Sequence, residues 1–231
     1  MDIIKKLAQE LAIKEEQAKA AVQLIDEGNT IPFIARYRKE MTGALNDETL
    51  RNLHERLLYL RNLEEKKEQV INAITDQGKM TEDLKKKILS AETLVAVDDL
   101  YRPYRPKKQT RATKAKEKGL EPLANILLLQ KTTKSMEEEA AAFVNAEKGV
   151  ANAKEAIAGA KDIIAEMIAD MADYRKSIRN CTMKQGSLVV KAKDEKAESV
   201  YEMYYDFREP LSKVTGYRVL AINRGEKEKF L

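Results

Sequence analysis

The sequence predicts a mainly α-helical protein: a multi-helix scaffold with long helices and one short β element near residues 186–193. Apolar residues recur at helical spacing through most of the 231 positions. Ala, Glu, Lys and Leu dominate, whereas the residues that interrupt helices are few, with 9 glycines and 5 prolines. The balance of 43% hydrophobic and 35% charged residues is typical of a soluble, helix-rich chain.

Two short helices are predicted first, over residues 2–11 and 18–25, and the second ends at Gly28. With little linker between them they form a helical hairpin. Each leaves one apolar stripe that needs a partner, and the nearest candidate is the long helix that follows.

That long helix is predicted between Asn46, a suitable N-cap, and Gly78, which readily adopts the left-handed conformation that ends a helix. Its apolar positions have a helical period with a polar interruption over residues 64–69: Leu50, Leu53, Leu57, Leu60, Leu63, Val70, Ile71 and Ile74. A helix of this span is about 45 Å long. Other helices must therefore pack along it, or it must form part of a protruding arm.

The loop before the long helix, residues 30–45, contains Pro32 at the first turn of a short helix and Gly43 at a turn. Three cations lie off its apolar side: Arg36, Arg38 and Lys39. One interpretation is a solvated face or ion pairs with Glu40 and Asp47. The other is a patch that faces phosphate groups.

A strongly basic segment spans residues 101–118. It holds eight lysines and arginines and one acid, Glu117, so its charge of about +7 exceeds the +4 of the whole chain. Two prolines hold its first part extended, and Thr110 is suited to cap a helix that runs to Gly119.

Cations interleaved with tyrosines suit nucleic acid, because Lys and Arg bind phosphates and aromatic rings stack on unpaired bases. The candidate binding residues are Arg102, Tyr104, Arg105, Lys107, Lys108, Arg111 and Lys114. The alternative is a rigid basic connector docked on the helical core, in which Asp98 and Asp99 neutralise Arg102 or Arg105.

The second half of the chain predicts further helices. An apolar helix covers residues 120–129, Ser135 and Glu138 form a capping box, and Asn152 caps a second long helix that extends to about Thr182. A strand follows over residues 186–193, without an obvious partner. An aromatic stretch at 201–207 has helical spacing and is interpreted as packing residues, with base stacking as the alternative, and the run before Leu231 is strand-capable.

The sequence offers no catalytic, metal or cofactor site. Cys181 and His54 are each the only residue of their type, and the single cysteine fits a reducing compartment. Three carboxylates share one face of the second long helix, Asp162, Glu166 and Asp170, and are interpreted as a solvated stripe. We therefore expect a cytoplasmic protein that is not an enzyme, needs no cofactor and does not enter a membrane.

Several segments resemble the bacterial Tex family of transcription accessory proteins, which is related to a eukaryotic Spt-family elongation factor. The most specific is Ile31-Pro32-Phe33-Ile34-Ala35-Arg36-Tyr37-Arg38-Lys39 followed by Thr42-Gly43. The Tyr/Arg-Pro units of the basic segment, residues 158–166 and the run Arg224-Gly225-Glu226-Lys227-Glu228 are similar in the same order.

The resemblance implies a fragment of a longer protein, truncated before an RNase H-like domain, helix-hairpin-helix motifs and an OB-fold RNA-binding domain. We expect two regions or one continuous architecture: residues 1–119, with the long helix 46–78 and a basic connector at 99–118, and residues 120–231. The implied function is a scaffold associated with nucleic acid, RNA or DNA, that makes weak, sequence-independent phosphate contacts. The alternative is a protein–protein docking module for the transcription or translation machinery.

Overall fold

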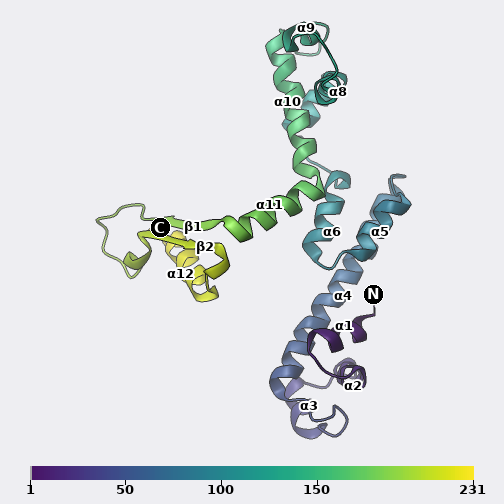
Figure 1. Cartoon of the computed structure of the whole chain (residues 1–231), viewed down its shortest axis with the longest axis vertical. Coiled ribbons are helices and arrows are strands. Elements are labelled where there is room, and N and C mark those ends of the chain that lie inside the picture. The colour runs from purple at the N-terminus through teal and green to yellow at the C-terminus, as the bar shows by residue number, and fades with distance from the viewer. Residues whose placement is uncertain (1) are drawn as a thin grey trace. The chain divides into compact units, whose positions relative to one another are not determined.

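The computed structural model describes residues 2–231, which form two compact units that divide between Pro106 and Lys107 (Figure 1). The mainly α prediction is confirmed, because helices hold most of the described residues and the strands form one antiparallel pair. The predicted domain division after residue 119 stays a prediction. In the structure, however, the helix of the basic segment packs within the second unit.

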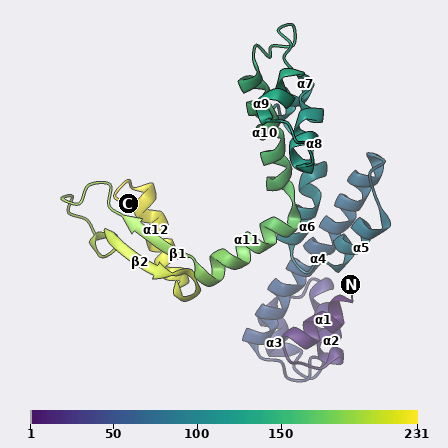
Figure 2. The ribbon, with the colours of Figure 1, turned by 45° about the horizontal axis from the view of Figure 1, so that its top comes forward.

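The first unit is organised by one long helix, α4 (Asp47–Asp76). The side chain of Asn46 accepts a hydrogen bond from the Thr49 N–H, and Gly78 has a φ of 65°, so both predicted ends are confirmed. The other helices of this unit are α1 (Ile3–Glu10), α2 (Glu15–Asp26), α3 (Ile31–Tyr37), α5 (Glu82–Ser90) and α6 (Leu94–Tyr101), with a 3-10 turn η1 (Arg102–Tyr104). Helices α1 to α3 surround the N-terminal half of α4, and α5 and α6 lie along its C-terminal half (Figure 2).

Helix α4 contributes residues to two hydrophobic clusters. Leu50, Leu53, Leu57 and Leu60 pack with α1 to α3, whereas Leu63, Val70 and Ile74 pack with α5 and α6. The interruption expected at residues 64–69 is only partly polar surface, because Lys67 is 2% exposed. Its ammonium group donates to Glu64 Oε1 at 2.8 Å and to the Leu89 carbonyl at 2.9 Å.

The second unit begins with four packed helices: α7 (Arg111–Glu117), α8 (Glu121–Leu129), α9 (Met136–Ala141) and α10 (Ala153–Asp170). Small residues bring them close together, among them Ala112 and Ala115 of α7 and Ala156 and Ala160 of α10, all buried. Gly159 of α10 lies so near Leu120 that an added Cβ would come within 2.4 Å of its Cδ1. Helix α7 is therefore held in position by close packing against α10.

The prediction of a single long helix from Asn152 to about Thr182 is wrong. The structure has two helices there, α10 and α11 (Ala172–Gln185). Met171 separates them in an extended conformation, with φ −72° and ψ 116°, so the helical hydrogen bonds stop there. Neither Pro nor Gly marks the break, and the apolar period runs through it. No residue of α11 is buried.

The strand predicted at 186–193 is confirmed as β1 (Ser187–Lys191), and its partner is β2 (Asp206–Pro210), with Val190 opposite Phe207. The aromatic stretch was therefore wrongly assigned to a helix. Tyr201 and Tyr204 lie at a 3-10 turn, η2 (Glu202–Tyr204), and pack with Val190 and Ile222. The interpretation that these aromatics pack is confirmed.

The strand-capable run near the C-terminal residue is also a helix, α12 (Gly216–Lys227), which follows a 3-10 turn, η3 (Leu211–Lys213). Burial explains the difference, because Ile222 and Gly225 turn one helical face toward the hairpin cluster. Among the described residues, no helix has both the length and the apolar character needed to cross a membrane.

Candidate nucleic-acid interface

The seven residues predicted to bind nucleic acid lie on both sides of the division between the units. Arg102, Tyr104 and Arg105 belong to the first unit, and the other four, Lys107, Lys108, Arg111 and Lys114, belong to the second. The prolines do not keep the first part fully extended, because Arg102–Tyr104 forms the 3-10 turn η1.

In the first unit, the tyrosine and one arginine are already engaged. Tyr104 is half-buried against the cluster around Ile88 and Val97, and its carbonyl accepts a hydrogen bond from Gln77 Nε2 at 3.0 Å. Arg105 donates to Asp98 Oδ1 at 3.0 Å. Its guanidinium carbon also lies 5.6 Å from the centre of the Tyr101 ring. The predicted neutralisation of Arg105 by Asp98 is thus confirmed, and this turn is anchored on its own unit.

In the second unit, Lys107 is held by the acidic stripe of α10. Its ammonium group donates to Glu166 Oε1 at 2.7 Å and to Asp170 Oδ2. The Lys107 side chain is 27% exposed and that of Asp170 10%. Burial by itself would lower the pKa of Lys107, but the hydrogen bonds that its ammonium group donates to Asp170 and Glu166 outweigh burial, and its pKa lies above the ordinary value. Lys107 remains a cation whose charge is compensated within the protein.

The stripe of Asp162, Glu166 and Asp170 is therefore not a solvated face. Asp170 is buried, Glu166 also faces the Thr110 hydroxyl at 3.4 Å, and Asp162 lies 3.7 Å from Arg111 Nε. The sequence contained a signal for this arrangement, because acids at every fourth position of one helix are complementary to a segment of charge about +7. The stripe docks the start of the basic segment onto α10.

The rest of the basic segment is presented outward on α7. Thr110 caps this helix by accepting from the Thr113 N–H at 3.1 Å, as predicted. Arg111 is 87% exposed in spite of its long contact with Asp162. Lys108 and Lys114 are exposed, and neither forms an ion pair in the described part of the chain.

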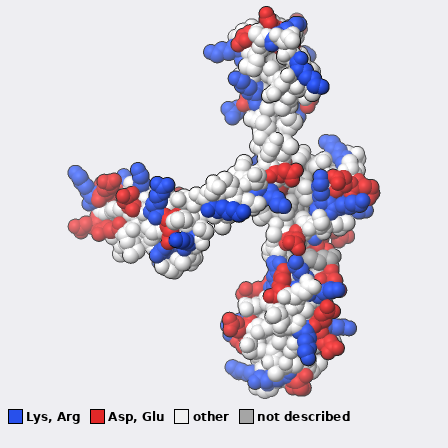
Figure 3. All heavy atoms as spheres, in the orientation of Figure 1, with Lys and Arg blue, Asp and Glu red and all other residues white. Residues whose placement is uncertain are grey.

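Two further lysines at the end of α7 make local contacts. Lys116 lies 3.3 Å from Glu121, and Lys118 donates to the Gly149 carbonyl at 2.8 Å. Between α7 and α10 runs a shallow groove of about 240 Å³, lined by Arg111, Lys114 and Lys118 on one side and by Glu155 and Asp162 on the other. Arg111 and Lys114 line this groove, and Lys108 is exposed in the chain just before α7. We call these three exposed cations the α7 face. Figure 3 shows that lysines and arginines are spread over the visible surface of both units, so exposed charge alone does not mark a site.

The fold and this site define a class of protein: a helical scaffold with exposed cations on and just before one short helix, α7, which packs against α10. Residues 1–75 match the family model described as Tex-like protein N-terminal domain, and residues 131–231 match the one described as Tex central region-like. The chain belongs to the Tex family, and the resemblance seen in the sequence is confirmed.

Relatives from distant organisms support this assignment. The chain is 44% identical over 228 residues to the uncharacterized protein YdcI of Bacillus subtilis, with 97% of this chain and 32% of the relative covered. It is 42% identical to the transcriptional accessory protein Tex of Neisseria gonorrhoeae and 32% identical to the human S1 RNA-binding domain-containing protein 1. All of this chain is covered in both, but only 30% and 24% of the relatives. The chain thus spans about a third or less of the length of these relatives.

Proposed function

We propose that this chain is the helical scaffold of a Tex-like transcription accessory protein and that it makes sequence-independent contacts with nucleic acid through the α7 face. The observation that supports the proposal is the outward display of Lys108, Arg111 and Lys114 beside a neighbour, Lys107, that is fixed on α10. Backbone phosphates are bound by such exposed cations without regard to base sequence.

The docking of Lys107 gives the α7 face a defined position. Hydrogen bonds to two carboxylates and the cap at Thr110 fix the start of α7, while Ala112 and Ala115 fix its inner side. A preorganised cationic surface loses less conformational entropy on binding than a mobile tail of the same charge. Four residues that were predicted to bind, Arg102, Tyr104, Arg105 and Lys107, have no part in this narrower proposal.

The relatives' names agree with an association with nucleic acid. One is a transcriptional accessory protein, and another contains an S1 RNA-binding domain. For this chain we propose a role in binding RNA or DNA, without catalysis or a cofactor and within the cytoplasm.

The test is a titration of the chain with labelled single- and double-stranded oligonucleotides at 50 and 200 mM salt. A variant with Lys108, Arg111 and Lys114 changed to Gln is compared with a matched control in which Lys79, Lys85 and Lys86, exposed cations of the first unit, are changed to Gln. We expect the α7 variant to bind duplex about tenfold or more weakly, with a salt dependence reduced by about two to three phosphate contacts. Equal losses in both variants would refute a local site.

A second candidate function is docking of a protein partner from the transcription or translation machinery. The observation that favours it is the surface of α11, where Tyr174, Ile178 and Met183 are 49%, 66% and 55% exposed. Apolar docking at this helix would be insensitive to salt, in contrast to binding through the α7 face. The oligonucleotide titration separates the two functions, because binding that weakens steeply between 50 and 200 mM salt supports the α7 face, whereas negligible binding at both concentrations favours docking of a protein partner.

A further inference from the structure

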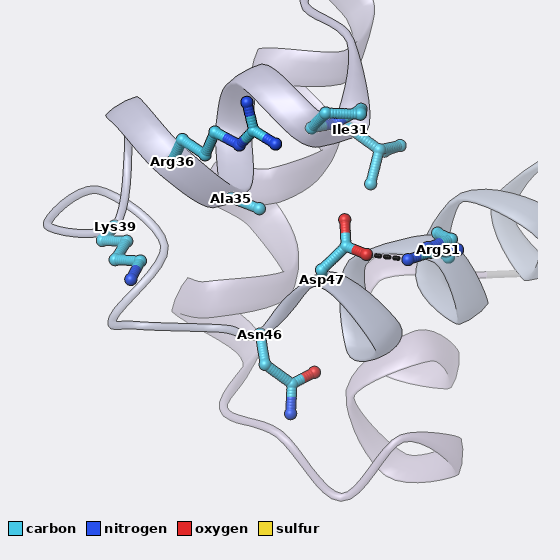
Figure 4. A pocket seen from close by; sticks show the side chains of 8 residues that line it. Ile31, Ala35, Arg36, Lys39, Asn46, Asp47 and Arg51 are labelled. Atoms are coloured by element: carbon cyan, nitrogen blue, oxygen red, sulfur yellow. Dashed lines mark hydrogen bonds and ion pairs between the residues drawn. The ribbon is translucent and has the colours of Figure 1, made fainter.

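The loop between α3 and α4, which carries the most specific family resemblance, forms a pocket that the proposed function does not use. The pocket has a volume of about 660 Å³ and lies entirely in the first unit. Ile31, Pro32 and Ala35 form an apolar wall, and the polar lining consists of Arg36, Lys39, Asn46, Asp47 and Arg51. Figure 4 shows Arg36 and Lys39 on one side of Asp47 and Arg51, paired with Asp47, on the other.

The cations of this pocket are only partly compensated. Arg51 is paired with Asp47, one turn before it on α4, and its side chain is still 67% exposed. Arg36 and Lys39 are exposed and have no ion-pair partner among the described residues, so the expected pairs with Glu40 and Asp47 are not formed. Three cations and one carboxylate line the pocket, which gives the lining a local charge of about +2.

The third cation of this loop has a different role. Arg38 donates to the Tyr37 carbonyl at 3.1 Å, and its guanidinium carbon lies 5.2 Å from the centre of the Phe33 ring. It does not line the pocket. Arg38 matches neither interpretation of the three cations, because it is used within the fold. Arg36 and Lys39 are exposed, as expected of a solvated face, and both are accessible to a ligand. The interpretation that they face phosphate groups stays a prediction.

The backbone that carries Lys39 is fixed by its own contacts. Thr42 is fully buried and its hydroxyl donates to the Arg38 carbonyl at 3.3 Å. Gln17 Nε2 donates to the carbonyls of Thr42 and Gly43 at 3.2 and 2.9 Å, which ties the loop to α2. The Ala44 N–H donates to the Lys39 carbonyl at 2.8 Å. A loop held at both ends in this way presents its cations in a preformed arrangement.

We propose that the α3–α4 pocket binds the phosphate group of a nucleotide, either a mononucleotide or the terminal nucleotide of a strand. At neutral pH a phosphate monoester carries a charge of about −1.5 to −2, which matches the uncompensated charge of the lining. Arg36, Lys39 and the remaining N–H donors of Arg51 bind its oxygens, and the wall of Ile31, Pro32 and Ala35 packs against the nucleoside. The volume lies within the usual range for sites of small ligands, about 300–1,000 Å³.

The site is tested by following the backbone amide NMR signals of the whole chain at constant ionic strength. The probes are a nucleoside 5′-monophosphate, the corresponding nucleoside, inorganic phosphate, and a short oligonucleotide with and without a 5′-phosphate. We expect saturable shifts at residues 31–51 with the monophosphate, weaker binding of inorganic phosphate and no binding of the nucleoside. The oligonucleotide should shift the same residues only when it carries the 5′-phosphate.

The matched variants are Arg36→Gln with Lys39→Gln, and Lys5→Gln with Lys19→Gln, which removes two exposed cations of the same unit outside the pocket. We expect the first pair to weaken binding of the monophosphate about tenfold or more and the second to leave it unchanged. Equal affinity in both pairs, or binding of the nucleoside as tight as that of the monophosphate, would overturn the proposal. Equal affinity for inorganic phosphate and the monophosphate would overturn the assignment to a nucleotide.

This inference does not depend on the α7 face. The two sets of cations lie in different units, so the Arg36 and Lys39 variant leaves Lys108, Arg111 and Lys114 intact. Either proposal, nucleic-acid contact at the α7 face or phosphate binding in the α3–α4 pocket, can therefore be refuted without affecting the other.

Discussion

Lys107 binds the carboxylate of Asp170, which lies sixty-three residues further along the chain. This ion pair joins the start of the basic segment to the end of α10, where the side chain of Asp170 is 10% exposed. The charge of Lys107 is thereby used for docking, whereas Lys108, Arg111 and Lys114, which follow it, are exposed.

Replacing Lys107 by Met should destabilise the second unit by about 1–3 kcal/mol, because the largely buried carboxylate of Asp170 loses a charged donor. Lys108→Met is the matched control, since Lys108 is exposed and makes no ion pair in the described structure, and it should change stability by less than about 0.5 kcal/mol. Urea unfolding followed by circular dichroism measures both. Equal stability of the two variants would show that the ion pair contributes nothing net.

Replacing Gly159 by Ala should destabilise the helical part of the second unit by about 1 kcal/mol or more. The new Cβ would lie 2.4 Å from Leu120 Cδ1 and 3.3 Å from Ala115 Cβ, and this overpacking outweighs the gain in helix propensity. Gly216→Ala, at the start of α12, is the control, because nothing lies within 4 Å of the added Cβ. Thermal unfolding should show opposite signs for the two changes, and a stabilising Gly159→Ala would contradict the close packing.

Replacing Lys67 by Ala should cost the first unit about 2–4 kcal/mol. Its ammonium group, in a residue 2% exposed, donates to both Glu64 and the Leu89 carbonyl, so truncation removes one charged donor from each of two acceptors. Lys66→Ala, which removes a more exposed lysine that lies 3.6 Å from Asp98, should cost less than about 1 kcal/mol. The urea concentrations at the unfolding midpoints of the two variants are compared. Similar midpoints would rule out a stabilising role for the buried ammonium group of Lys67.

Acid should weaken the attachment of α1 to α4. The pKa of Glu10 lies below its ordinary value of 4.5, chiefly because Arg56 hydrogen-bonds its carboxylate at 2.6 and 2.9 Å, in opposition to burial. Since the unfolded chain binds this proton more tightly, the stabilising contribution is present above about pH 4.5 and is lost as the pH falls through the lower pKa of the folded state.

Thermal unfolding between pH 7 and pH 3 should therefore show a smaller loss of stability in Glu10→Gln than in the unchanged protein. Glu16→Gln, at an exposed position of α2, is the control and should follow the unchanged protein. An identical pH dependence in all three proteins would exclude a role for the Glu10–Arg56 pair.

The parts of the fold that were predictable from the sequence are those in which local chemistry and tertiary packing agree. The caps at Asn46 and Thr110 and the left-handed residue Gly78 each act within a few residues, so the pattern alone indicates them. The break at Met171 and the strand β2 depend on contacts with distant segments. Neither has a local signal, because the apolar period continues through Met171 and the partner of β1 lies in an aromatic stretch with helical spacing.

For the candidate nucleic-acid interface, the sequence indicates which residues are present but not the role of each one. The charge of the basic segment is evident from the sequence, whereas the division of that charge between docking and display is not. Lys107 and Lys108 are neighbours of the same type, and only the position of Glu166 and Asp170 on α10 distinguishes them. The pocket at Arg36 and Lys39 likewise depends on how α3 turns against the first turns of α4.

Helix α4 passes from one hydrophobic cluster of the first unit into the other between Leu60 and Leu63, without an interruption. Tyr59 touches both clusters, and its hydroxyl accepts a hydrogen bond from the Leu94 N–H at 3.1 Å. Because each residue of an α-helix advances the side chains by about 100° around the axis, one residue inserted after Leu60 would rotate the attachment site of α5 and α6 by that angle relative to α1, α2 and α3. The length of this connection is therefore as constrained as its composition, and insertions or deletions there would be tolerated only in multiples that restore the helical phase.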